Sequence, residues 1–117
     1  MDIESLRTYC LAKPGTSEGL PFDEDTLVFK VMGKLFAPTS LSDPRTVNLK
    51  CDPERAIELR TDYPDDILPG YHMHKKYWST VSLTLGDSLL RTLIDHSYDQ
   101  VFAGLKKADR DQLRDNA

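Results

Sequence analysis

Apolar residues recur along the chain with two periods, one typical of helices and one typical of strands. Ile3, Leu6 and Cys10 follow the period of an amphipathic helix, and a Pro-Gly pair shortly afterwards predicts its end. Alternating residues on either side of Gly33 predict two strands joined in a hairpin. The whole pattern predicts helices over residues 2–12, 53–61 and 88–105, and strands over residues 26–32, 34–40, 46–50 and 78–85.

The remaining segments are predicted to be connections or edges. Residues 63–70 contain two prolines and predict a loop, an edge strand is expected near residues 20–22, and residues 109–114 predict a short terminal turn. The order αβββαβα predicts an α+β fold, a two-layer sandwich in which helices cover one face of an antiparallel sheet. No repeat or internal boundary is visible, so residues 1–117 are expected to form a single domain.

The period of two assigns the strand residues to opposite faces of the sheet. The face expected to meet the helices carries Leu27, Phe29, Val31, Leu35, Ala37, Val47, Leu49, Val81, Leu83 and Leu85. The opposite face is expected to carry Lys30, Lys34, Thr46, Asn48, Lys50, Trp78, Thr80, Ser82 and Thr84, together with Val28, Met32 and Phe36. A face of this mixed composition is either an ordinary solvated surface or a binding surface.

Charge narrows the choice of ligand. The net charge of −4 argues against a generic nucleic-acid-binding protein, which usually carries a basic excess. The basic residues are nevertheless concentrated in two segments: Lys30, Lys34, Arg45 and Lys50 lie in one, and Lys75 and Lys76 lie in the other. Two strands of one sheet would bring these segments together and create a local positive surface.

Residues 71–78 combine cations with aromatic rings, in the order Tyr-His-Met-His-Lys-Lys-Tyr-Trp. Cations beside aromatic faces suit an anion with a stackable ring, and nucleic acid is the common example. Each feature can also be explained without a ligand, because Trp78 can pack in a half-buried position and the two lysines can be solvated. His72 and His74 are spaced so that both could chelate a metal, but no third ligand lies nearby, and no metal is expected.

Other signals bound the class of protein. Cys10 and Cys51 fit reduced thiols, and the absence of a signal peptide or an apolar run of about 20 residues predicts a cytoplasmic protein. The sequence contains no Walker loop, no dinucleotide fingerprint, no nucleophile elbow and no His-Glu-x-x-His. We therefore expect no enzyme, no catalytic residue and no cofactor.

Several stretches, taken together, resemble the MmcQ/YjbR family of small bacterial proteins. They are residues 7–15 with Glu18, and residues 21–23, 29–37, 47–54, 69–78 and 95–99. The resemblance implies a fold similar to frataxin (CyaY) and a DNA-binding protein with a double-wing arrangement. Two positions differ from the family pattern before the tryptophan: His74 stands where Asn is usual, and Tyr77 where His is usual.

The sequence thus predicts a non-enzymatic protein that binds DNA, or another phosphorylated anion, with weak sequence preference, as a monomer or weak homodimer. The residues expected to bind nucleic acid are Lys30, Lys34, Arg45, Lys50, His72, His74, Lys75, Lys76, Tyr77 and Trp78. The alternative is a small-molecule or protein-interaction module that uses the same face. A third reading, a metal-linked protein of frataxin type, would depend on the acidic residues 23–25.

Overall fold

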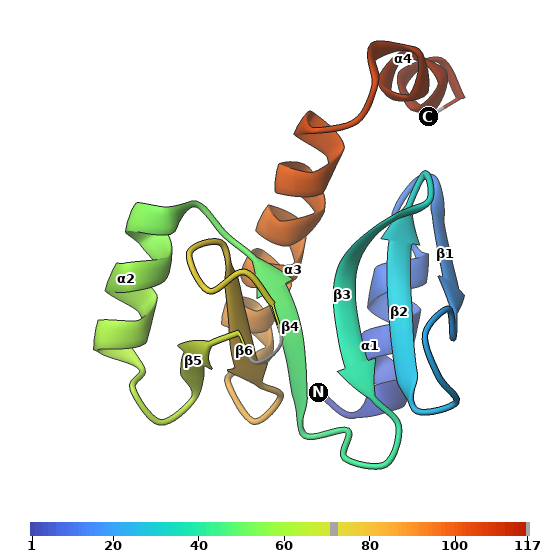
Figure 1. The fold of residues 1–117 in the computed structure, drawn as a ribbon. Helices are drawn as coiled ribbons and strands as arrows, with labels where there is room; N and C mark the ends of the chain where they lie inside the picture. The colour runs from blue at the N-terminus through green and yellow to red at the C-terminus, as the bar shows by residue number, and fades with distance from the viewer. Residues whose placement is uncertain (71–72, 117) are drawn as a thin grey trace.

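The computed structural model describes residues 1–70 and 73–116, in which the chain forms a mixed α+β fold (Figure 1). Its elements in chain order are α1 (Ile3–Leu11), β1 (Thr16–Gly19), β2 (Thr26–Val31), β3 (Lys34–Ser40), β4 (Thr46–Lys50), α2 (Pro53–Asp62), β5 (Ile67–Pro69), β6 (Trp78–Ser82), α3 (Asp87–Ala103) and α4 (Lys107–Asn116). The strands form one sheet in the order β1-β2-β3-β4-β6-β5, and every neighbouring pair is antiparallel. This confirms the predicted fold class.

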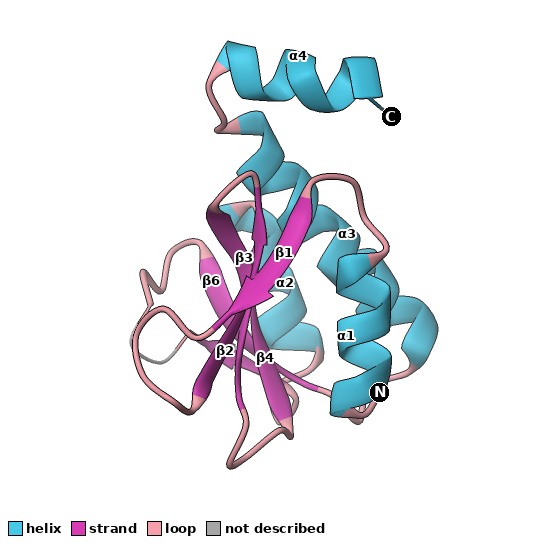
Figure 2. Cartoon of the chain, turned by 90° about the vertical axis from the view of Figure 1, so that its right-hand side faces the viewer, coloured by secondary structure: helices cyan, strands magenta, loops and turns pink. Residues whose placement is uncertain are grey.

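The helices α1, α2 and α3 lie on one side of the sheet and leave its other side open (Figure 2). α3 packs against β2, β3 and β4, whereas α1 packs against β1 and α2 against β5. The core between the layers is built from the apolar faces of strands and helices. Its fully buried residues include Leu6, Phe29, Val31, Phe36, Val47, Leu90 and Ile94. A closer likeness to frataxin and a double-wing arrangement stay predictions.

The hairpin between β2 and β3 forms where the sequence predicted it. Met32 and Gly33 form the two-residue turn and have positive φ angles of 47° and 82°. Positive φ at both central residues is the requirement of a type I′ turn, whose twist matches that of the flanking strands. The turn closes with Val31 opposite Lys34, so that Lys34 is exposed at the tip of the hairpin.

The predicted faces hold for β4 and β6 but not for the start of β3. There the register shifts, with Ala37 opposite Phe29 and Leu35 opposite Lys30, so that Phe36 is an extra residue in β3. A β-bulge of this kind breaks the alternation of faces. The prediction that Leu35 faces the core and Phe36 faces outward is therefore wrong. Phe36 is fully buried, and its ring packs edge-on against Tyr98, with ring centroids 5.5 Å apart.

Three elements differ from the predicted segments. The edge strand is β1, which lies before residues 20–22, and residues 63–70 contain the short strand β5 instead of a loop alone. The terminal turn is a ten-residue helix, α4. β1 and β5 contain few buried side chains, and they belong to the sheet through backbone hydrogen bonds with one neighbour each. Such strands leave no hydrophobic alternation in the sequence.

Four consecutive residues of α3 tie this helix to the rest of the fold. Asp95 accepts hydrogen bonds from Tyr9 Oη at 2.6 Å and Lys13 Nζ at 2.5 Å. Tyr98 Oη donates to the carbonyl of Pro14 at 2.6 Å. The other two residues, His96 and Ser97, hold the end of β4, which carries part of the open face.

Ser97 bridges β3 and β4 where the two strands stop pairing with each other. Its hydroxyl donates to the carbonyl of Phe36 at 2.6 Å and accepts from the backbone N–H of Lys50 at 2.8 Å. The two strands pair directly further along, where Thr39 lies opposite Val47. A buried side chain from the helix layer thus satisfies two main-chain groups that a continuous ladder would otherwise pair. It also fixes the backbone position of Lys50.

His96 holds the turn that follows β4 and is the basis of a pH prediction. Its Nε2 accepts the backbone N–H of Asp52, the N-cap of α2, at 3.1 Å, and only a neutral imidazole can do so. Burial, and then the positive charge of Arg55, lower the pKa of His96, while Asp99 and Asp52 oppose this effect. The unfolded chain therefore takes up the proton more readily than the folded chain. The contribution of His96 to the stability of the fold is therefore fully present above about pH 6.5, the pKa of an unperturbed histidine. It is lost progressively as the pH falls from there toward the lower pKa of the folded state.

The variant His96→Gln isolates this effect, because its amide oxygen can accept the same N–H without titrating. Thermal unfolding between pH 7.5 and 5.5 will show the wild-type protein losing stability relative to His96→Gln as the pH decreases. Parallel pH profiles for the two proteins would contradict the assigned role of His96.

Candidate anion-binding face of the sheet

The open face of the sheet presents one side chain from every second strand position. Antiparallel pairing places Lys30 beside Leu35, and Lys50 beside Trp78. One row further along the strands, Asn48 lies opposite Thr80. Lys50, Asn48 and Trp78 therefore occupy the predicted open face, together with Thr46 and Ser82. Lys30 and Lys50 lie on strands that are separated by β3, which corresponds to about 10 Å between the strand axes.

The centre of this face is hollowed into a groove of about 570 Å³. Two of the residues that line it, Phe22 and Met73, belong to loops outside the strands. The other residues that line it include Leu35, Pro38, Asn48 and Thr80. Most of this lining is apolar, although Phe22 is 68% exposed. A groove of this size and lining has the character of a small-ligand site, which combines apolar walls with a few polar groups.

Two lysines and a histidine lie close to the ring of Tyr77, near the groove residue Asn48 along β4. We call Lys50, His74, Lys76 and Tyr77 the Tyr77 cluster. Lys50 Nζ lies 5.9 Å and Lys76 Nζ lies 5.6 Å from the centroid of the Tyr77 ring. The His74 ring centroid lies 5.0 Å from that of Tyr77, with the two planes tilted by 53°. The distances to both lysines are those of cation–π contacts, so positive charge is concentrated around an aromatic face.

Arg60 holds the segment that carries this cluster. Its Nη2 donates to the carbonyls of Lys75 and Trp78, both at 2.7 Å, and its Nε donates to Ser79 Oγ at 3.1 Å. The guanidinium thus joins the end of α2 to the turn before β6 with three directed hydrogen bonds. Gly70 approaches the same turn so closely that a Cβ there would lie 2.9 Å from the carbonyl oxygen of Trp78. The sequence analysis missed Arg60, because nothing in the sequence around it marks this contact.

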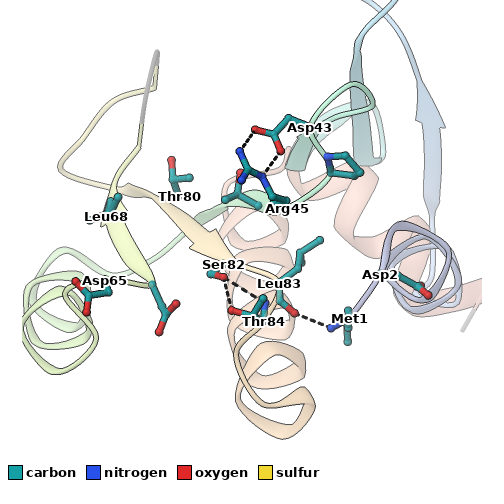
Figure 3. Close-up of a pocket in the computed structure, with 13 residues that line it drawn as sticks. Met1, Asp2, Asp43, Arg45, Asp65, Leu68, Thr80, Ser82, Leu83 and Thr84 are labelled. Carbon is teal, nitrogen blue, oxygen red and sulfur yellow. Dashed lines mark hydrogen bonds and ion pairs between the residues drawn. The ribbon is translucent and has the colours of Figure 1, made fainter.

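A second hollow, of about 480 Å³, continues the open face toward the loop between β3 and β4 (Figure 3). It shares Thr46 and Thr80 with the groove but is bordered by carboxylates, namely Asp2, Asp43, Asp65 and Asp66. Arg45 is 82% exposed here, and its Nε and Nη2 donate to the two carboxylate oxygens of Asp43 at 2.5 and 3.0 Å. The open face is therefore basic and aromatic at one end and acidic at the other.

The predicted binding residues are thus distributed unevenly. The structure brings together Lys50, His74, Lys76 and Tyr77, with Trp78 half-buried beside Lys50 and Lys75 exposed in the same turn. Lys30 shares their face, whereas Lys34 lies at the hairpin tip and Arg45 lies at the acidic end, bound by Asp43. His72, and with it Tyr71, lies outside the described residues.

The acidic residues 23–25 have local partners. Asp23 accepts from the backbone N–H groups of Asp25 and Thr26 at 2.8 and 2.6 Å. Asp25 accepts from Ser40 Oγ and the N–H of Ser42, both at 2.7 Å. These hydrogen bonds lower the pKa of both carboxyl groups. Over residues 1–70 and 73–116, no group of three or more His, Cys, Asp or Glu side chains is arranged to hold a metal ion.

The fold and this face define a class of small α+β proteins in which helices cover one face of a single antiparallel sheet and the other face is open. The YjbR family model matches residues 11–100, so the chain belongs to the YjbR family. It is 38% identical over 116 residues to the uncharacterised protein YjbR of Escherichia coli strain K12, covering 97% of this chain and 98% of that protein. It is 37% identical over 114 residues to the uncharacterised protein YbdF of Escherichia coli O157:H7, covering 95% and 93% of the two chains.

Solved structures show the same fold. The crystal structure of Deinococcus radiodurans protein DR2400, described with the family-model domain DUF419, superimposes with a TM-score of 0.88 at 42% identity, covering 96% of this chain and 87% of that one. A protein from Pseudomonas syringae superimposes with a TM-score of 0.65 at 26% identity, covering 83% of this chain and 96% of that one. None of the helices described in this chain combines the length and apolar composition needed to cross a membrane.

Proposed function

We propose that this protein binds nucleic acid through the open face of its sheet. The observation that carries the proposal is the Tyr77 cluster, in which two lysine ammonium groups lie within 6 Å of one aromatic ring, and one of these lysines is two residues from the groove residue Asn48 on β4. Lysines attract phosphates, and an aromatic face stacks on bases of any sequence. Lys75 is exposed in the same turn as the cluster, and Lys30 adds positive charge on the open face of β2.

The geometry favours a single strand over a duplex. Helices α1 and α3 are packed on the far side of the sheet, so neither can enter a major groove from the open face. An exposed sheet with aromatic and basic residues is a recurrent surface for unstacked bases. Arg45 contributes little to this proposal, because Asp43 already compensates its charge. A cytoplasmic location, where such a ligand would be met, stays a prediction.

The proposal is tested by fluorescence anisotropy of labelled single-stranded and duplex DNA in a series of salt concentrations. If Lys50, Lys75 and Lys76 each contact one phosphate, the logarithm of affinity for single strands will fall with the logarithm of salt at a slope of about −2, from about −0.7 per phosphate. Duplex DNA is expected to bind more weakly. Absence of binding to either form at low salt would overturn the proposal.

A small planar metabolite is the second candidate, because the groove has the size and the apolar lining of a small-ligand site. This alternative predicts an affinity that changes little with salt, since apolar contacts are not screened by ions. The same salt series therefore separates the two candidates. A protein partner on this face is a further alternative, which the salt series does not separate from the metabolite.

A further inference from the structure

Asn48 offers an oriented hydrogen-bond donor in the lining of the groove. Its side chain lies on the open face of β4, directly opposite Thr80 of β6. Its Oδ1 accepts from Thr80 Oγ1 at 2.7 Å. Within the part of the chain that the structure describes, the NH2 group of this amide donates to no residue. The hydrogen-bonding group that Asn48 offers to a ligand is therefore a donor.

The surroundings of Asn48 suit a flat ring. Leu35 and Pro38 extend the apolar lining, while Phe22 and Met73 form walls that rise from the neighbouring loops. A planar ring that enters this groove buries apolar surface against these side chains, and its edge can meet the amide. Apolar walls with one fixed donor select a planar ligand by shape and by the presence of an acceptor at one position.

The Tyr77 cluster lies next to Asn48 along β4, through Lys50. Lys50 follows Asn48 by two residues on the same face of β4, which corresponds to about 7 Å along the strand. From this position the flexible side chain of Lys50 can reach the phosphate of a nucleotide whose base edge lies at Asn48. Toward the other end of the face, Asp65 and Asp66 line the acidic hollow and repel further phosphates. The face thus suits a ligand of one or a few nucleotides.

We propose that the groove is a base-binding subsite that selects bases with a keto oxygen at the edge facing Asn48. Thymine presents its O4 acceptor there, whereas cytosine presents the N4 amino group, which would oppose the amide donor. The phosphate of the same nucleotide lies on Lys50 and Lys76. This inference rests on the proposed function and adds the class of ligand that the face prefers.

The test compares the binding of labelled tetrathymidylate and tetracytidylate to the 117-residue chain, by anisotropy at low salt. The wild-type protein is expected to bind the thymidylate about 3- to 10-fold more tightly, the value of one hydrogen bond gained or lost. In Asn48→Ala the ratio will fall to about 1. In Asn48→Asp the ratio will invert, because a carboxylate accepts from the amino group of cytosine. Using the ratio cancels the general effect of a new negative charge on phosphate binding.

Ser82→Ala is the matched control, since Ser82 lies on the same face but lines the acidic hollow. It should leave the ratio unchanged. Competition with thymidine monophosphate shows whether the ligand is a nucleic-acid strand or a free nucleotide. If the oligonucleotide binds more than about tenfold more tightly than the monophosphate, the strand is the ligand. If the two affinities are equal, the free nucleotide is the ligand. A wild-type ratio near 1, or a ratio that the Asn48 variants do not change, overturns the subsite while leaving nucleic-acid binding in place. Absence of binding to both oligonucleotides overturns the two proposals together.

Discussion

Replacing Lys50 and Lys76 together by alanine is expected to lower the affinity for single-stranded DNA by about 10- to 100-fold at low salt. Both ammonium groups lie within 6 Å of the centroid of the Tyr77 ring, so the double variant removes the positive charge beside the stacking surface. Two lost phosphate contacts should also reduce the salt slope by about 1.4, from about 0.7 per contact. Anisotropy across a salt series measures both quantities.

The matched control for this experiment is Lys106→Ala with Lys107→Ala. These two lysines are exposed at the start of α4, which lies away from the open face, and their removal changes the net charge by the same amount (Figure 1). The control should retain most of the affinity. Equal losses in the two double variants would mean that binding responds to net charge alone and that the Tyr77 cluster has no special role.

Ser97→Ala is expected to lower the free energy of unfolding by about 2–4 kcal/mol. The substitution removes the partner of two main-chain groups at once, the carbonyl of Phe36 and the N–H of Lys50. Each buried polar group that loses its partner costs about 1–3 kcal/mol. Denaturant unfolding followed by circular dichroism measures the change.

Ser88→Ala serves as the control for Ser97→Ala, because Ser88 is an exposed residue of the same helix. It should change stability by less than about 0.5 kcal/mol. A loss in Ser97→Ala no larger than in this control would show that water or a backbone shift replaces the hydroxyl, and that the bridge between β3 and β4 does not depend on it.

The sequence predicted those parts of the fold in which side chains alternate between water and the core. Val47 and Val81 are buried while Thr46 and Ser82 are not, and this alternation identified β4, β6 and the open face. The bulge at Phe36 was not predictable in this way, because one inserted residue leaves no mark in the composition of a strand. The strands β1 and β5 were not predicted for a different reason, since they bury few side chains and show no alternation of apolar and polar residues.

In the candidate site, too, residues that lie close together in the sequence were predicted, whereas the contacts of Arg60 with distant residues were not. Residues 74–78 were identified from their composition, and the structure places Lys50 beside them through strand pairing that the period of two had suggested. The pairing of Arg45 with Asp43 is a local contact between near neighbours that the sequence analysis did not weigh. Arg60 lies fifteen or more residues from the groups it binds, so only the fold reveals its role.

The most direct test of nucleic-acid binding on the open face is an NMR titration of the ¹⁵N-labelled protein with tetrathymidylate. The proposed site predicts that amide shifts concentrate on Lys30, Leu35, Asn48, Lys50, Tyr77 and Thr80, with little change in α1, α3 and α4. Shifts confined to the helical layer would contradict the assignment of the site to the sheet. No shifts at millimolar oligonucleotide would contradict nucleic-acid binding itself.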